Sequence, residues 1–245
     1  MPSKNTAIVS QKSMSTSTNA KLTKLSHADL LARVPLFSSL SRLQLDVLAA
    51  STTKRRYKRG EVVIKQGDTS HALYVLIAGQ ASVIASDTQG KEIILATIKT
   101  GDYLGEMSVI DGQPHSANVV ADGLTDLLIL ARAELLSCLQ ESPAVSISLM
   151  RELVRRLRRA DEKIESLALM DVYGRVARVL LEMATANAEG VLTIRNKVSK
   201  QNIAKMIGAS REMVTKVFKN LGQKGVLTIQ ADGSLQLQDR VDTFL

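Results

Sequence analysis

The segment SKQNIAKMIGASREMVTKVFKNL (residues 199–221) carries the most specific structural signal in this sequence. Ser199 can cap a helix over residues 200–207, because its hydroxyl can accept a hydrogen bond from a free N–H of the first turn. Gly208 provides a tight turn, since glycine adopts a positive φ at little cost, and Ser210 can cap a second helix. This order of elements is a helix-turn-helix. The residues that match its template are Gln201, Ala204, Gly208, Ser210 and Val214.

Each of the two predicted helices has an apolar face. We expect burial of Ile203, Ala204 and Ile207 on the first helix, and of Met213, Val214, Val217 and Leu221 on the second. The exposed face of the second helix begins with Arg211, which can bind guanine through two hydrogen bonds, and Glu212, which can accept from cytosine N4. Lys216, about one turn further on, can reach guanine or a phosphate. The candidate DNA contacts are Ser199, Lys200, Gln201, Ser210, Arg211, Glu212, Thr215, Lys216 and Lys219.

Positive charge is concentrated around this motif. The chain has a formal net charge of +8, and residues 195–224 contain eight Lys or Arg against a single acid, Glu212. Such a segment fits a polyanionic partner. Residues 225–237 then alternate apolar and polar side chains around Asp232-Gly233, which is typical of a β-hairpin. A hairpin directly after a recognition helix is a wing, so the sequence favours a winged helix-turn-helix over a pair of surface helices without function.

The remaining composition limits the class of protein. A length of 245 residues allows one or two domains, each with its own core. No apolar run reaches the ~20 residues that span a bilayer, and residues 1–27, rich in Ser, Thr and Lys, lack the apolar region of a secretion signal. We therefore expect a cytoplasmic protein without a membrane partner, and a disordered tail over 1–27. The one cysteine, Cys138, excludes a four-cysteine iron–sulfur cluster within the chain, and we interpret it as a core residue rather than a redox switch.

The segment after the tail predicts short helices followed by a β-rich domain. Apolar residues recur at helical spacing over 28–49, with Pro35 between two groups of them. Over residues 57–130, short β-favouring runs alternate with glycines, which indicates an antiparallel sandwich or barrel. A hairpin loop is expected at 86–90. The expected strands are Val62–Ile64, Leu73–Ile77, Ala81–Ala85, Ile93–Ile98, Asn118–Ala121 and Leu127–Leu130.

A long helix is expected after Pro143, up to Tyr173, because this stretch has no internal Gly or Pro. Apolar side chains recur along it at spacings of three and four residues, which gives a heptad-like seam. The seam consists of Met150, Leu153, Leu157, Ala160, Ile164 and Leu167. Many charged residues flank it, so we favour a homodimer seam over a helix that packs only on its own domain.

Taken in this order, the parts resemble the superfamily of the cyclic AMP receptor protein and the fumarate–nitrate regulator (Crp/Fnr), across residues 28–237. GDYLGEMSVIDGQPHSA (101–117) is similar to the family's phosphate-binding cassette. LALMDVYGRVARVLL (167–181) looks like its hinge between domains. The helix-turn-helix contributes Ser210, Arg211, Glu212 and Lys216.

The resemblance implies both an architecture and a function. The fold class is α+β, with a cyclic-nucleotide-binding, jelly-roll-like β-roll over 28–142, a long dimerisation helix and hinge over 143–173, and a winged helix-turn-helix over 174–245. The implied function is that of a homodimeric transcription regulator, which binds double-stranded DNA at a pseudo-palindromic operator with TGTGA-like half-sites. A cyclic nucleotide between the roll and the long helix would control its DNA affinity. No tightly bound cofactor, metal site or catalytic residue is implied, and RNA polymerase is a further candidate partner.

The implied ligand site departs from the family at two places. Cyclic-AMP-binding relatives hold the cyclic phosphate with an Arg followed by a Ser, where this chain has His115 and Ser116. An imidazole lacks the permanent charge and the fork of donors of arginine. On the long helix the relatives contact adenine with a Thr-Ser pair, where this chain has Ala160 and Asp161. The implied ligand contacts are Gly105, Glu106, Met107, His115, Ser116, Ala117, Arg159 and Asp161.

These departures leave the effector open between cyclic di-GMP and cyclic AMP. Arg158 and Arg159 favour a more anionic or guanine-rich ligand, unless they only form a solvated charged surface. One alternative is a constitutive regulator with a vestigial pocket, in which His115 is merely a surface loop residue. A cyclic-nucleotide-binding enzyme subunit is disfavoured, because the sequence has no metal-ligand cluster, nucleophile elbow or Walker loop.

Overall fold

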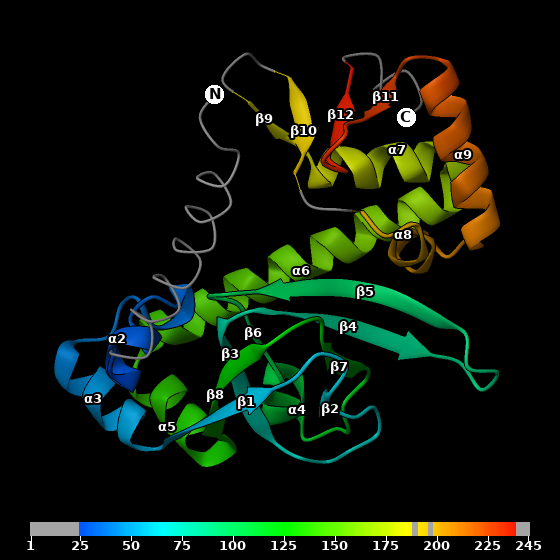
Figure 1. Ribbon diagram of the computed structural model, residues 1–245. Helices are drawn as coiled ribbons and strands as arrows, with labels where there is room; N and C mark the ends of the chain where they lie inside the picture. The colour runs from blue at the N-terminus through cyan, green and yellow to red at the C-terminus, as the bar shows by residue number, and fades with distance from the viewer. Residues whose placement is uncertain (1–24, 188–190, 196–197, 239–245) are drawn as a thin grey trace, which may run out of the picture. The chain divides into compact units, whose positions relative to one another are not determined.

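The computed structural model describes residues 25–187, 191–195 and 198–238. Within these residues the chain forms two compact units, and Figure 1 shows their elements in chain order. The first unit comprises the residues up to Val83 together with Ala96–Glu152, and the second comprises Ile84–Leu95 together with the residues from Leu153 onward. Each unit is considered by itself below.

The first unit begins with three short helices, as the sequence predicts. They are α2 (His27–Leu31), η1 (Pro35–Phe37) and α3 (Arg42–Ala50). Ser26 and Ser41 each form a capping box, in which the serine hydroxyl accepts from the backbone N–H of the third helical residue. Residues 1–24 of the predicted tail lie outside the described residues. The cap at Ser26 lies two residues before the predicted domain start at residue 28, and that boundary stays a prediction.

Two four-stranded sheets form the β-roll. One sheet has the order β1-β8-β3-β6, formed by β1 (Thr52–Tyr57), β8 (Thr125–Ala131), β3 (Ala72–Ala78) and β6 (Tyr103–Leu104). The other has the order β2-β7-β4-β5, formed by β2 (Val62–Ile64), β7 (Asn118–Ala121), β4 (Gln80–Ser86) and β5 (Glu92–Lys99). β3 pairs antiparallel with β8 along most of its length. The six predicted strands and the predicted loop between β4 and β5 are confirmed.

Two strands of the roll have no clear signal in the sequence. β1 reads TTKRRY and buries only Tyr57, because it lies at the edge of its sheet. It pairs with β8 in antiparallel register from Thr52 opposite Leu130. Arg56 adds two hydrogen bonds to the Asp126 carboxylate, at 2.6 and 2.9 Å. β1 is stabilised by backbone pairing with β8 and by these charged hydrogen bonds rather than by burial of apolar side chains. Its sequence therefore shows no apolar–polar alternation that would predict a strand. β6 is too short to show any alternation.

Apolar side chains from both sheets form the interior of the roll. Full burial of one such aliphatic or aromatic side chain contributes about 1.5–3 kcal/mol. Two helices that the sequence pattern does not predict, α4 (Glu106–Asp111) and α5 (Arg132–Glu141), pack against each other and against β3. The interior set is Tyr57, Val63, Ile64, Tyr74, Leu76, Ala81, Ile98, Leu104, Val119, Ala121 and Leu127.

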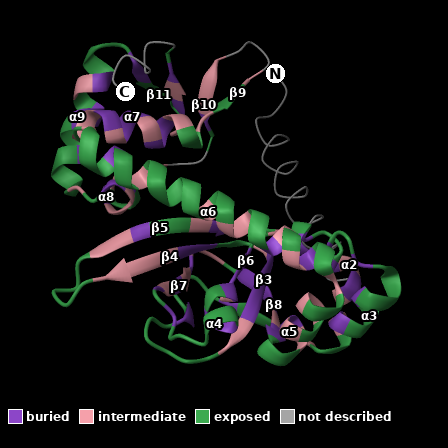
Figure 2. Ribbon diagram, turned by 180° about the vertical axis from the view of Figure 1, so that it is seen from behind, coloured by how far each residue is buried: buried purple, intermediate pink, exposed green. Residues whose placement is uncertain are grey.

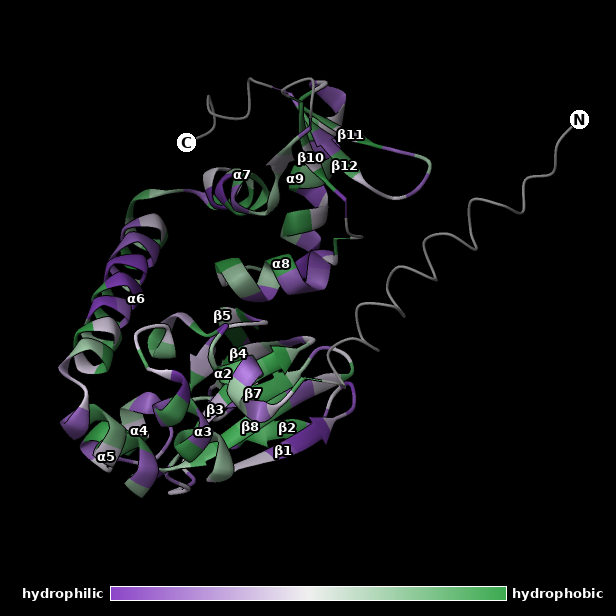
Figure 3. Cartoon of the chain, turned by 90° about the vertical axis from the view of Figure 1, so that its left-hand side faces the viewer, coloured by the Kyte–Doolittle hydropathy of each residue, from purple (hydrophilic) through white to green (hydrophobic). Residues whose placement is uncertain are grey.

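The predicted long helix is α6 (Pro143–Leu169). It stops short of the predicted end at Tyr173, because Asp171 caps the next helix and its carboxylate accepts from the Gly174 N–H at 2.9 Å. Most of α6 has the colour of exposed residues in Figure 2, and Figure 3 shows it as largely hydrophilic with apolar turns. Two residues of the predicted seam on this helix are largely exposed, Leu157 at 62% and Ile164 at 64%.

The last part of the second unit is a helical domain with a small antiparallel sheet. Its helices are α7 (Val172–Met183), α8 (Lys200–Ile207) and α9 (Arg211–Gln223). The sheet has the order β11-β12-β10-β9, formed by β11 (Leu227–Ile229), β12 (Leu235–Leu237), β10 (Leu192–Ile194) and β9 (Thr185–Ala186). The predicted hairpin is confirmed, since β11 pairs with β12 and Gly233 turns between them at φ 83°.

The predicted domain boundaries at residues 142 and 173 stay predictions. Among the helices that the structure describes, none combines the length and the apolar character needed to cross a membrane.

Candidate DNA-reading surface and effector site

The turn between α8 and α9 has the geometry that the sequence predicts. Ser199 caps α8 by accepting from the Asn202 N–H, and Ser210 caps α9 by accepting from the Met213 N–H at 3.2 Å. Gly208 ends α8 in the left-handed region, at φ 65°, and its N–H donates to the Ala204 carbonyl. The helix-turn-helix is therefore set by local capping at both of its helices.

The inner face of α9 differs from the predicted one at a single position. Val214, Val217 and Leu221 are buried as expected, but Met213 is 48% exposed and Phe218 takes the remaining place in the core. At about 100° per residue, Met213 lies a quarter turn or more away from the direction of Val214. The prediction that Met213 is a core residue is wrong, because the buried stripe continues through Phe218 at the i+4 position.

α7 packs against the helix-turn-helix, formed by α8 and α9, on the side opposite the exposed face of α9. Val176 and Leu180 of α7 are fully buried in the same core as Ile203 and Val214. Arg175 donates from Nη1 to the Ile207 carbonyl at 2.9 Å, and so satisfies a free acceptor at the C-terminus of α8. This hydrogen bond joins α7 to the turn that positions α9.

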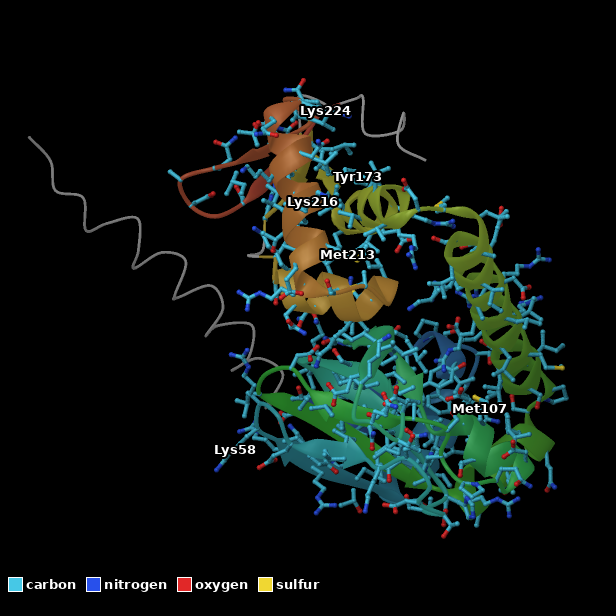
Figure 4. The ribbon with its side chains drawn as sticks, turned by 90° about the vertical axis from the view of Figure 1, so that its right-hand side faces the viewer. Lys58, Met107, Tyr173, Met213, Lys216 and Lys224 are labelled. Atoms are coloured by element: carbon cyan, nitrogen blue, oxygen red, sulfur yellow. The ribbon has the colours of Figure 1, made fainter. Side chains whose placement is uncertain are left out.

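The exposed face of α9 carries the predicted base-reading side chains. Arg211, Glu212 and Lys216 are exposed, and Lys219 follows one turn after Thr215. Figure 4 labels Met213, Lys216 and Lys224 in order along this helix. The structure thus brings the predicted contacts of α9 together on one solvent-facing surface.

Two of the predicted DNA contacts are already engaged within the domain. The Thr215 hydroxyl donates to the Arg211 carbonyl at 2.8 Å, which leaves it only as an acceptor. The half-buried Lys200 places its ammonium 5.3 Å from the centre of the Phe218 ring. Ser199, Gln201 and Ser210 are exposed at the helix N-termini. The assignment of all these residues to DNA binding stays a prediction.

Glu212 is held in its charged form at the start of α9. Hydrogen bonds from its own backbone N–H and from the Ser210 hydroxyl, together with the Arg211 charge, lower the pKa of its carboxyl. An ionised carboxylate can only accept hydrogen bonds. The side chain therefore has the protonation state that recognition of a cytosine amino group requires.

In the roll, the predicted cassette begins at a tightly constrained glycine. Gly105 precedes α4 at φ 87°, and a Cβ there would lie 2.3 Å from the Ala72 carbonyl oxygen and 3.1 Å from Cδ2 of Tyr74. No other residue fits this position without a shift of β3. Glu106 then starts α4 with its side chain buried at 3% exposure, while Met107 points to solvent.

His115 is a buried residue of the cassette, so its interpretation as a surface loop residue is wrong. It is 8% exposed, and its Nε2 lies 2.6 Å from the Ser70 carbonyl oxygen. Because a carbonyl only accepts, Nε2 must carry the hydrogen, which leaves Nδ1 as an acceptor in the neutral ring. Two backbone hydrogen bonds tie the residue to Gly67 and Asp68. Ser116 is exposed and Ala117 buried.

A second histidine beside the cassette has no signal in the sequence. Nδ1 of His71 lies 2.8 Å from the hydroxyl of buried Ser108 on α4. The two residues are far apart in the chain, and only the pairing of the strands brings them together. Arg159 and Asp161 lie exposed on α6 in the second unit, and their part in ligand binding stays a prediction.

The described residues offer little for metal or thiol chemistry. The half-buried Cys138 has a raised pKa, because burial and the nearby Glu141 both disfavour the thiolate. This environment favours the interpretation of Cys138 as a packing residue. Within the ranges that the structure describes, no group of three or more His, Cys, Asp or Glu side chains could hold a metal ion.

Comparisons with known proteins assign both parts of the chain. The family model named cyclic nucleotide-binding domain matches residues 54–142, and the Crp-like helix-turn-helix domain matches residues 174–241. The cyclic AMP receptor protein of Thermus thermophilus is 31% identical over 205 residues, which cover 84% of this chain and 93% of that protein. The cAMP-activated global transcriptional regulator Vfr of Pseudomonas aeruginosa is 30% identical over 195 residues, or 76% and 90% of the two chains. The c-di-GMP-responsive global regulator CLP of Xanthomonas campestris has a similar structure, with a TM-score of 0.70, 25% identity, and coverage of 80% of this chain and 99% of that one.

Proposed function

Since this chain belongs to the Crp/Fnr family of cyclic-nucleotide-binding transcription regulators, we propose that it is a dimer whose sequence-specific DNA binding is controlled by cyclic AMP or cyclic di-GMP. The family consists of transcription regulators rather than enzymes, which confirms the expectation that the chain is not an enzyme. The dimer, the effector and the individual contacts are parts of the proposal.

One observation supports specific DNA reading above all. The first turn of α9 exposes Arg211 and an ionised Glu212 next to each other, and Lys216 follows on the same helix. Recognition helices contact base edges with their N-terminal residues. A cation that can bind guanine, set beside an anion that can accept from cytosine, suits G·C pairs within TGTGA-like half-sites.

The test is fluorescence anisotropy on a duplex with two TGTGA half-sites and on duplexes with one changed base pair. For Arg211→Ala we expect weaker binding to the parent duplex by about 1–3 kcal/mol and no discrimination at one G·C pair. Lys219→Ala is the matched control, because loss of a phosphate contact weakens binding to all the duplexes about equally and reduces the salt dependence. Full discrimination by Arg211→Ala would exclude the proposed base contact.

The exposed seam of α6 supports the dimer. Large apolar side chains of Leu157 and Ile164 face solvent two turns apart, within a segment of α6, residues 151–165, in which ten of the fifteen residues are charged. Two copies that pair along this seam would bury it in a coiled coil. A two-fold axis would also set two α9 helices on half-sites about 34 Å apart, which matches a pseudo-palindromic operator.

The cassette supports a cyclic nucleotide as effector without distinguishing between the two candidates. The names of the relatives from Thermus and Pseudomonas point to cyclic AMP, and that of the relative from Xanthomonas to cyclic di-GMP. Titration calorimetry with cyclic AMP, cyclic GMP and cyclic di-GMP decides between them. If none of the three gives heat while specific DNA binding is intact, the chain is a constitutive regulator with a vestigial pocket.

A further inference from the structure

Met213 is an apolar side chain on a surface that is otherwise polar. It lies in the first turn of α9, beside Glu212, and is 48% exposed. At about 100° per residue it lies about 60° around the helix from Lys216 and about 160° from Thr215. It therefore stands at the Lys216 edge of the exposed face.

The core of the domain does not need this methionine. Val214, Val217, Phe218 and Leu221 fill the inner face of α9, and all four are buried. The Met213 backbone N–H has its own task, since it donates to the Ser210 cap, but any residue except proline supplies that N–H. The side chain is therefore available to a partner of α9.

We propose that Met213 reads a thymine by contact with its C5-methyl group in the major groove. This inference rests on the proposed function, because it requires α9 to enter that groove. The flanking cations Arg211 and Lys216 favour DNA as the partner that covers this face. Among the four bases, only thymine presents a methyl group in the major groove, and apolar side chains recognise it by contact. A thioether is polarisable and flexible, but it has no hydrogen to donate to a phosphate or a base.

The proposed contact between Met213 and a thymine methyl group adds recognition of an apolar group on the base, which Arg211 and Glu212 do not provide. Arg211 and Glu212 read hydrogen-bonding groups of G·C pairs, so they do not select thymine by its methyl group. A methionine at the edge of the same turn adds that selection. Burial of one methyl group corresponds to about a four-fold change in affinity, which is the effect to be measured.

The experiment removes a single methyl group from the DNA. Each thymine of a duplex with two TGTGA half-sites is replaced in turn by deoxyuridine, and binding is measured by fluorescence anisotropy, with and without cyclic AMP or cyclic di-GMP. For the wild-type chain we expect affinity to fall about four-fold at one thymine of each half-site. Met213→Ala should bind the thymine and uracil duplexes equally at that position.

Two further variants separate the contact from effects on the fold. Met213→Leu keeps an apolar side chain of similar size and should retain sensitivity to the methyl group. Gln223→Ala changes an exposed residue in the last turn of α9 that is not among the candidate DNA contacts, and it should show the wild-type pattern of uracil effects. Equal uracil sensitivity of wild type and Met213→Ala, with specific binding intact, would overturn the thymine contact alone. Absence of specific binding by the wild-type chain under all these conditions would overturn the proposed function together with it.

Discussion

Gly105 gives the sharpest test of how the cassette is built, because a matched glycine lies at the other end of the same short helix. Gly105 precedes α4 at φ 87°, and Gly112 follows it at φ 70°. Alanine at either position has to adopt the left-handed conformation, which costs about 1–2 kcal/mol. The two sites differ in their surroundings. A Cβ at Gly112 meets nothing within 4 Å, whereas a Cβ at Gly105 lies 2.3 Å from the Ala72 carbonyl oxygen.

The close approach to the Ala72 carbonyl sets how much stability Gly105→Ala loses beyond the loss in Gly112→Ala. Ala72 begins β3, which pairs with both β8 and β6, so its carbonyl cannot move without loss of strand pairing. Overpacking of this kind costs about 1–3 kcal/mol. We therefore expect Gly112→Ala to destabilise the chain by about 1–2 kcal/mol and Gly105→Ala by about 2–5 kcal/mol, the sum of both effects.

Thermal unfolding followed by circular dichroism and scanning calorimetry measures the difference. At about 2–4 °C per kcal/mol for a chain of this size, Gly112→Ala should lower the Tm by a few degrees, and Gly105→Ala should lower it further, by about 2–12 °C more, because of the additional cost of about 1–3 kcal/mol. Equal shifts for the two variants would refute the reasoning, because the close approach of β3 to Gly105 would then contribute nothing.

Four other substitutions test separate parts of the structure. His115→Arg should raise the affinity for the cyclic nucleotide that binds, on the order of ten-fold by calorimetry, because a guanidinium offers a charged fork to a phosphate; an unchanged affinity would place the phosphate elsewhere. The pKa of Asp126 is lowered mainly by hydrogen bonds from its arginine partner, so its stabilising effect is present above the ordinary aspartate pKa of about 4 and is lost as the pH falls through the lowered value. Asp126→Asn should therefore lower the urea midpoint near neutral pH and flatten its decline in acid, and parallel profiles for variant and wild type would contradict this. Ser210→Ala should lower stability by about 1 kcal/mol in urea, since it removes the cap of α9; an unchanged midpoint would show that the cap adds nothing. Leu157→Glu should convert the proposed dimer to a monomer in sedimentation experiments, whereas Leu169→Glu, on a still more exposed leucine off the seam, should not; a dimer in both variants would exclude the seam.

Elements with local signals are predicted well from the sequence. Ser199, Gly208 and Ser210 each form the cap or turn that their residue type favours, because capping depends on neighbours within four residues. The six short β-favouring runs and the hairpin at Gly233 are also predicted correctly, because their own composition and the turn residues between them mark them locally. The seam of α6 is visible as a heptad-like pattern, and the structure leaves it exposed.

Features that depend on residues far apart in the sequence cannot be predicted from local sequence patterns. β1 is held by pairing with β8 and by the bond between Arg56 and Asp126, so its own residues show no strand pattern. The burial of His115 comes from its contact with Ser70, which is distant in the sequence. Met213 and Phe218 are both apolar residues of α9, and only the packing of α8 and the wing decides which of them is buried.

The division of α9 into two faces has a consequence for how such regulators diversify. The buried residues that hold the domain together and the exposed residues that are proposed to contact the operator belong to one helix but share no side chain, apart from the cap at its start. If the proposed base contacts are correct, changes at Arg211, Glu212, Met213 or Lys216 alter which promoters are recognised at little risk to folding, because all four side chains are exposed. Gene duplication followed by drift at these four positions can separate two regulatory networks, and the same four positions are the natural library for an engineer who wants to retarget the protein.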